Sequence, residues 1–266
     1  MEKIIIRSLT KVFPARYGSI TALAQLDLVI HEHEFCVLLG PSGCGKTTLV
    51  RIMAGLDRQT SGEMSIAHTD AGKPPTAMVF QEDSIFPWMT VEENIGYGLR
   101  LRHVPPAVVR RIVGSYLEQV GLARFARAYP FQLSGGMKKR VSVARAFAVD
   151  PDVLLMDEPF GELDEQTRVL LQAELVKIWE ETKKTVVFIT HSIDEAVVLA
   201  DRIFLMTAAP GRVKATVEVP VPRPRQAYEI RADPAYGRLT RRLWELLREE
   251  VMKSKAAEVG ARVPGP

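Results

Sequence analysis

The sequence has little of several features that mark specialised proteins. Only two of its 266 residues are cysteines, Cys36 and Cys44, which gives no disulfide framework and suits a reducing compartment. The net charge is only +3, which gives no reason to expect a nucleic-acid partner. No apolar run approaches the roughly 20 residues that cross a bilayer. The first residues carry no long apolar segment, so we expect no secretion signal.

Short apolar strands alternate with amphipathic helices along most of the chain. We expect strands at 4–9, 26–30, 35–39, 77–80, 153–156, 185–189 and 203–206, and helices at 46–54, 165–181 and 193–200. Strands that alternate with helices in this way indicate an α/β fold with a parallel sheet.

Two stretches depart from this alternation. Helical periodicity dominates from about 88 to 150, which predicts an inserted helical subdomain inside a domain over 3–220. Prolines 220, 222 and 224 predict a stiff linker, so residues 221–266 form an extension. We expect this extension to hold one helix, over about 235–252, and a frayed tail at 263–266.

A glycine-rich loop follows the expected strand at 35–39. Its residues fit the pattern G-x-x-x-x-G-K-[ST] between a strand and a helix, the context that a phosphate-binding loop requires. Lys46 is expected to reach the β- and γ-phosphates, and Thr47 to offer its hydroxyl to Mg²⁺. A thiol reagent at Cys44 is expected to block the loop. The nucleotide-binding residues are predicted to be Gly40, Pro41, Ser42, Gly43, Cys44, Gly45, Lys46, Thr47 and Thr48.

Two carboxylates, Asp157 and Glu158, end the apolar strand at 153–156. Asp157 is expected to bind Mg²⁺, directly or through a water molecule, and Glu158 to polarise the attacking water as general base. The alternative is an ordinary strand end with solvated acids.

A second glycine pair comes just before a predicted helix. Ser134, Gly135 and Gly136 leave backbone N–H groups at the start of that helix, where the dipole favours an anion. A second phosphate-reading element beside a single phosphate loop suggests that another subunit completes the site. The basic run 138–140 that follows is interpreted as a helix face rather than a nucleic-acid contact.

In this order the motifs resemble those of the ATP-binding cassette (ABC) ATPases, the motor subunits of ABC transporters. The resemblance covers about residues 3–220 and implies a P-loop NTPase core with an antiparallel β subdomain and an inserted α-helical subdomain. Residues 133–137 resemble the signature motif, with Met137 where Gln is commonest. Residues 161–164 resemble the D-loop, with Glu162 where Ala is usual.

The resemblance also implies roles for single residues. Gln81 resembles the glutamine that touches Mg²⁺ and the water, and His191 the switch histidine that contacts the γ-phosphate. Phe13 aligns with the aromatic that stacks on adenine, with Tyr17 as the alternative in the same loop. Taken alone, an aromatic like Phe13 is more often a core residue, and His191 a cap or surface residue.

The family pairs two cassettes head to tail, with ATP between them. The signature residues would therefore contact the γ-phosphate of ATP bound to a second copy of the chain, and Asp164 would lie across the same interface. The residues expected to take part in catalysis are Lys46, Gln81, Ser134, Gly135, Gly136, Glu158, Asp164 and His191.

The segment 84–94 points to one branch of the family. It resembles the Leu-Pro-Trp-x-Thr-Val segment of cassettes that serve nitrate, sulfonate and taurine importers. Trp88 is either an anchor for a partner or part of the local core, and the sequence leaves both open.

We therefore expect an energy-coupling subunit of an importer, at the cytoplasmic face of the inner membrane. The expected partners are a second copy, two membrane-spanning permease subunits and, indirectly, a periplasmic solute-binding protein. The alternatives are a soluble ABC ATPase of DNA repair or translation and a nucleotide-dependent regulator. The first lacks support because the chain has neither a long coiled-coil insertion nor two cassettes, and the second because Glu158 and His191 are both present.

Overall fold

The computed structural model describes residues 1–15, 18–68, 70–223, 225 and 229–261, with side chains to residue 256. The chain divides into two compact units, one of Met1–Ala67 with Thr185–Pro266 and one of His68–Lys184. Within the described ranges, we find no helix both long enough and apolar enough to span a bilayer. Tyr17, Pro224 and the tail at 263–266 lie outside the described residues.

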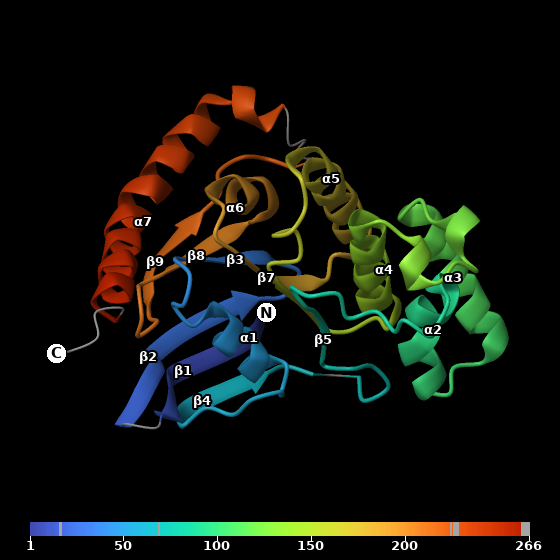
Figure 1. Cartoon of the computed structure of the whole chain (residues 1–266), viewed down its shortest axis with the longest axis horizontal. Coiled ribbons are helices and arrows are strands. Elements are labelled where there is room, and N and C mark those ends of the chain that lie inside the picture. The colour runs from blue at the N-terminus through green and yellow to red at the C-terminus, as the bar shows by residue number, and fades with distance from the viewer. Residues whose placement is uncertain (16–17, 69, 224, 226–228, 262–266) are drawn as a thin grey trace. The chain divides into compact units, whose positions relative to one another are not determined.

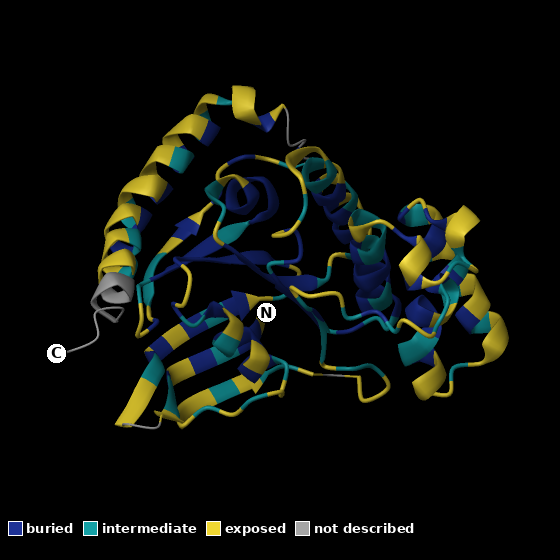
Figure 2. Ribbon diagram, viewed as in Figure 1, coloured by how far each residue is buried: buried dark blue, intermediate teal, exposed yellow. Residues whose placement is uncertain are grey.

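An antiparallel sheet of order β2–β1–β4 forms one part of the first unit (Figure 1). Strand β1 spans Glu2–Ala15, β2 spans Gly18–His31 and β4 spans Ser61–Ile66. Buried residues alternate with exposed or partly exposed ones along the second half of β2, as expected for a sheet with one face on the core (Figure 2). The sheet confirms the antiparallel subdomain that the family resemblance implies, although β1 and β2 run well beyond the predicted 4–9 and 26–30.

The same unit holds a mostly parallel sheet. Strand β3 (Phe35–Leu39) pairs in parallel with β7 (Thr185–Thr190) and with β8 (Arg202–Met206), and β9 (Val213–Glu218) adds an antiparallel edge. Every residue of β3 and β7 is buried, which explains why both read as unbroken apolar runs.

Among the described residues, three α-helices belong to this unit. Helix α1 (Lys46–Met53) follows β3, and α6 (Ile193–Leu199) follows β7. The long helix α7 (Pro234–Ala261) contacts α6 and lies beside β9, to which Lys214 joins it (Figure 1). It extends nine residues past the predicted end at Met252.

The second unit combines a strand pair with helices. Strands β5 (Thr76–Val79) and β6 (Val153–Asp157) are parallel. The helices are α2 (Val91–Leu101), α3 (Pro106–Gln119), α4 (Gly135–Ala148) and α5 (Glu165–Thr182). Helix α4 contacts α2, α3, α5 and β5. The prolines that break the periodicity start new elements, because Pro106 is the first residue of α3 and Pro130 opens a 3₁₀ turn.

Candidate functional site

The predicted phosphate loop connects β3 to α1 in the first unit. Gly45 precedes α1 with φ 96° and supplies no side-chain cap to the start of the helix, where the helix dipole favours an anion. A Cβ on Gly45 would lie 2.8 Å from the carbonyl oxygen of Ala22 and 2.7 Å from Leu23 Cδ2. Both the positive φ and the close approach of β2 therefore require glycine here.

The side chain of Lys46 is buried within the phosphate loop. Lys46 is 5% exposed, and its Nζ donates to the carbonyl oxygens of Gly40 and Pro41, both at 2.9 Å. The ammonium charge thus lies within the turn, beside the N-terminal end of α1, where phosphate oxygens would be attracted. Thr47 and Thr48 follow on the first turn of α1, with Thr47 exposed.

The expectation of a reactive Cys44 was wrong. The thiol is 1% exposed, with its Sγ 3.8 Å from Lys46 Nζ. Burial raises the pKa of Cys44, and the neighbouring Lys46 opposes this only in part. A buried, protonated thiol reacts slowly, so this cysteine is a packing residue of the loop.

His191 leaves β7 next to the start of the phosphate loop. Leu39 and Thr190 are partners in the β3–β7 register, so Gly40 and His191 each follow a paired residue at the same sheet edge. Ser192 caps α6 by accepting from the N–H of Glu195 at 3.3 Å. His191, at this turn, is exposed.

In the second unit, a parallel strand pair brings three predicted residues together. Val79 of β5 pairs with Met156 of β6, so Gln81, Asp157 and Glu158 follow at the same edge. Asp157 is 4% exposed, whereas Glu158 is half-buried with φ 41°. A positive φ is uncommon outside glycine and marks a strained backbone, which is often found at functional sites.

The signature residues and Asp164 each begin a helix of the second unit. Ser134 caps α4 by accepting from Met137 N–H at 3.4 Å, and Asp164 caps α5 by accepting from Thr167 N–H at 3.0 Å. That bond from Thr167 lowers the pKa of Asp164. A Cβ on Gly136 would lie 2.8 Å from Thr167 Cγ2, so the two helix starts are in close contact. Ser134 and Gly135 are exposed.

One contact near the signature was missed by sequence reasoning. Lys139, read as part of a basic helix face, is 3% exposed and donates to the carbonyl oxygen of Gln81. Asp83 pairs with Lys139 at 3.7 Å and with Lys138 at 3.4 Å. The lysines therefore join α4 to the segment that holds Gln81. The only hint of this contact in the sequence was that the lysines follow the signature motif closely along the chain.

The predicted adenine residue lies on a strand rather than in a loop. Phe13 is half-buried on β1, paired with Ile20 of β2, because the hairpin is longer than expected. Lys11 Nζ lies 4.6 Å from the centroid of its ring. Trp88, in contrast, is 70% exposed, and its ring centroid lies 5.5 Å from that of Phe86. The core-packing interpretation of Trp88 was therefore wrong.

Comparison with known proteins decides the family. Residues 23–161 match the ABC transporter family. This chain belongs to that family. It is 44% identical to an uncharacterized ABC transporter ATP-binding protein of Methanocaldococcus jannaschii, over 95% of this chain and 94% of the relative. As a member of the ABC family it is an ATP-binding, transport-coupled ATPase.

Two relatives of the ABC family are named by what they import. An aliphatic sulfonates import ATP-binding protein of Bacillus cereus is 43% identical over 84% of this chain and 88% of its own. A nitrate import ATP-binding protein of Synechocystis sp. is 39% identical over 91% and 94%. A solved dimeric ABC cassette, bound to ADP and Pi after hydrolysis, matches 82% of this chain and 99% of its own, with a TM-score of 0.72 and 32% identity.

Proposed function

We propose that this chain hydrolyses ATP to drive an importer of nitrate, a sulfonate, taurine or a related small solute. The observation that carries the proposal is that strand ends place the motif residues in two groups, Gly40–Thr47 with His191, and Gln81 with Asp157 and Glu158. Relatives named for sulfonate and nitrate import support the direction and the class of solute.

The residues supply complementary chemistry. Lys46 and the N–H groups of the loop bind the β- and γ-phosphates, and His191 contacts the γ-phosphate. Glu158 holds the attacking water and accepts its proton. Phe13 provides a ring for adenine, with Lys11 Nζ over one face of that ring.

The oxygen donors suit Mg²⁺. A hydroxyl from Thr47, an amide oxygen from Gln81 and a carboxylate from Asp157 are the hard ligands that this ion prefers. When bound, the ion neutralises charge on the β- and γ-phosphates.

A second copy of the chain completes the site in this proposal. Ser134, Gly135 and Gly136 reach the γ-phosphate held by the other copy, and Asp164 lies at the same interface. The solved dimeric cassette supports the pairing. The pair would bind two permease subunits at the cytoplasmic face of the inner membrane, with a periplasmic solute-binding protein as the indirect partner.

The test uses ATP-driven pairing. Glu158→Gln should form a dimer with ATP in size-exclusion chromatography with light scattering, with little phosphate release. Adding Ser134→Arg should keep the protein monomeric while it still binds ATP. Undiminished hydrolysis by Glu158→Gln would contradict the role of Glu158 as general base. Loss of ATP binding by the Ser134→Arg monomer would contradict the proposal that Ser134 contacts ATP held by the other copy.

A further inference from the structure

Helix α7 carries a buried acid that the site described so far does not use. Glu250 is 2% exposed, on a helix whose other glutamate nearby, Glu249, is 71% exposed. A carboxylate is buried at this depth only where hydrogen bonds replace water.

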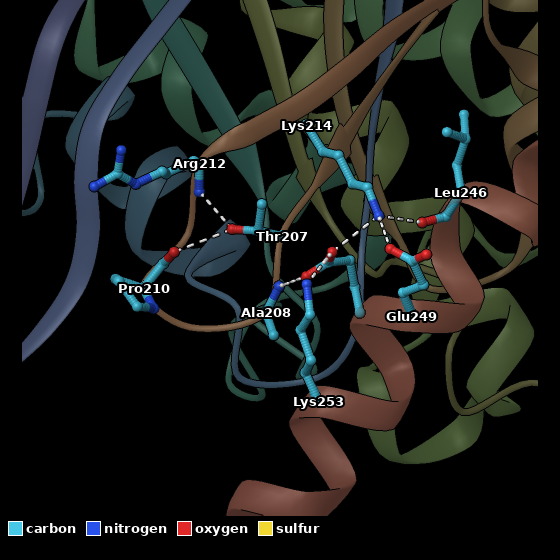
Figure 3. Close-up of polar contacts among 9 residues, drawn as sticks. Thr207, Ala208, Pro210, Arg212, Lys214, Leu246, Glu249 and Lys253 are labelled. Atoms are coloured by element: carbon cyan, nitrogen blue, oxygen red, sulfur yellow. Dashed lines mark hydrogen bonds and ion pairs between the residues drawn. The ribbon is translucent and has the colours of Figure 1, made fainter.

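The partners of Glu250 come from three segments (Figure 3). One carboxylate oxygen accepts from the backbone N–H of Ala208 at 3.0 Å, and the other from Lys214 Nζ at 2.9 Å and Lys253 Nζ at 3.0 Å. Lys214 also donates to the carbonyl oxygen of Leu246 at 2.9 Å. Burial alone would raise the pKa of Glu250, but the bonds from Lys214, Ala208 and Lys253 lower it to about 2. The carboxylate therefore stays charged near neutral pH.

The loop that Glu250 holds rests on the phosphate loop. Thr207 closes this loop, with its Oγ1 donating to Pro210 and accepting from the N–H of Arg212, both at 3.0 Å (Figure 3). Gly211 donates to the carbonyl oxygen of Ala22 at 2.9 Å, and a Cβ on Gly211 would lie 2.1 Å from the carbonyl oxygen of Cys44. Main chain thus packs directly on main chain, so a shift of the 207–212 loop moves the phosphate loop.

A second contact joins α7 to the phosphate loop without an intermediate. Ser254 Oγ donates to the carbonyl oxygen of Ser42 at 3.3 Å. Ser254 lies one helical turn beyond Glu250 and on the same face, so both contacts belong to one side of α7. The two contacts hold Ser42 and Cys44, which flank Gly43, whose φ is 74°.

We propose that α7 is a positioning element for the ATP loop, with Glu250 and Ser254 setting the loop conformation that binds phosphates. The inference rests on the proposed role of Gly40–Thr47. It assigns to the C-terminal helix a part in ATP affinity, acting through residues that do not touch the nucleotide.

The test compares variants of the full chain for ATP affinity. Glu250→Ala should weaken ATP binding about tenfold and Ser254→Ala about threefold, because each frees one anchor of the loop. Glu249→Ala is the matched control, since it removes only an exposed partner of Lys214, at 3.2 Å, and should leave affinity unchanged. At saturating ATP, kcat should stay within about twofold, because the reacting groups are intact.

If Glu250 and Ser254 only stabilised the fold, different results would be expected. Amide hydrogen exchange of residues 41–45 should rise in Glu250→Ala and in Ser254→Ala, well below the melting temperature. If the melting temperature falls while ATP affinity and loop exchange stay at the wild-type level, the inference is wrong. Ser254→Ala keeps the test open should Glu250→Ala fail to fold, because it removes a single bond from the surface.

Lys46→Ala separates this inference from the proposed function. If Lys46→Ala loses ATP binding and the two α7 variants do not, α7 has no positioning role while the loop assignment stands. If Lys46→Ala binds ATP as the wild type does, the loop assignment itself fails.

Discussion

At the scale of single residues, backbone conformation separates Glu158 from its neighbour. Asp157 ends β6 in an ordinary strand conformation, and Glu158 turns into the left-handed region with φ 41°. The N–H of Gly161 donates to the Glu158 carbonyl oxygen at 3.1 Å and helps to hold this turn. The strained backbone costs stability, of the order of 1–2 kcal/mol.

Glu158→Gly should therefore separate stability from activity. Glycine removes the strain but adds about 0.5–1 kcal/mol of chain entropy to lose, so the free energy of unfolding should stay equal or rise by up to about 1 kcal/mol. Hydrolysis should be lost with the carboxylate. Urea unfolding and phosphate release measure the two effects. Glu158→Gln is the control that keeps the strain, and a loss above about 1 kcal/mol in Glu158→Gly would contradict this account.

Both cysteines should be unreactive toward thiol reagents in the folded protein. Cys36 is 0% and Cys44 1% exposed, and burial raises the pKa of each thiol. A thiol-titrating reagent at pH 8 should find almost none without denaturant and both in urea. Rapid labelling of Cys44 in the native protein would show that the phosphate loop opens more readily than its packing indicates.

At the scale of elements, composition decided which strands the sequence could predict. β3, β6 and β7 are buried throughout, so their apolar runs stand out, and the predicted bounds fall within one residue of those observed. β4 and β9 were missed because polar residues interrupt their short apolar positions and most of their residues are at least partly exposed, a pattern that loops share. They become strands only by pairing with β1 and β8, which a local pattern does not reveal.

At the start of α2, the side chain of Asn94 stabilises the turn that precedes the helix. Asn94 is 0% exposed; its side-chain oxygen accepts from Phe86 N–H at 2.7 Å, and its amide donates to the carbonyl oxygens of Phe86 and Met89, both at 3.1 Å. These bonds hold the turn that carries Trp88.

Asn94→Ala should lower the free energy of unfolding by about 2–3 kcal/mol, because it leaves several buried backbone groups without partners. Chemical denaturation measures the loss, and the emission of Trp88 should change with it. Glu118→Ala, at an exposed position of α3, is the control and should change stability by less than about 0.5 kcal/mol. Equal effects of the two substitutions would show that the Asn94 bonds contribute little.

At the scale of the whole molecule, local motifs were predictable and the contacts that support them were not. Phosphate-loop and signature residues are recognised from spacing within a few positions. Lys139 with Gln81, and Glu250 with Ala208, are separated by 58 and 42 residues, so only the folded chain brings them together. Phe13 failed as a loop residue for the same reason, since the β1–β2 hairpin sets its place.

Exposure of Trp88 bears on assembly. A tryptophan with 70% of its surface in water contributes little to folding and is suited to a partner's pocket. Trp88→Ala should keep the free energy of unfolding within about 1 kcal/mol and reduce co-purification with the proposed permease subunits. Trp244→Ala, 52% exposed on α7, is the matched control. Normal recovery of the Trp88→Ala complex would remove the anchor role.

The contact between Gly136 and Thr167 limits what a substitution of Gly136 can reveal about contacts between subunits. A methyl group at Gly136 collides inside its own chain, so an inactive Gly136→Ala allele is no proof of a missing subunit contact. Gly135 has nothing within 4 Å of an added Cβ. An allele at that neighbouring position therefore tests the proposed contact with a second chain without a collision inside its own.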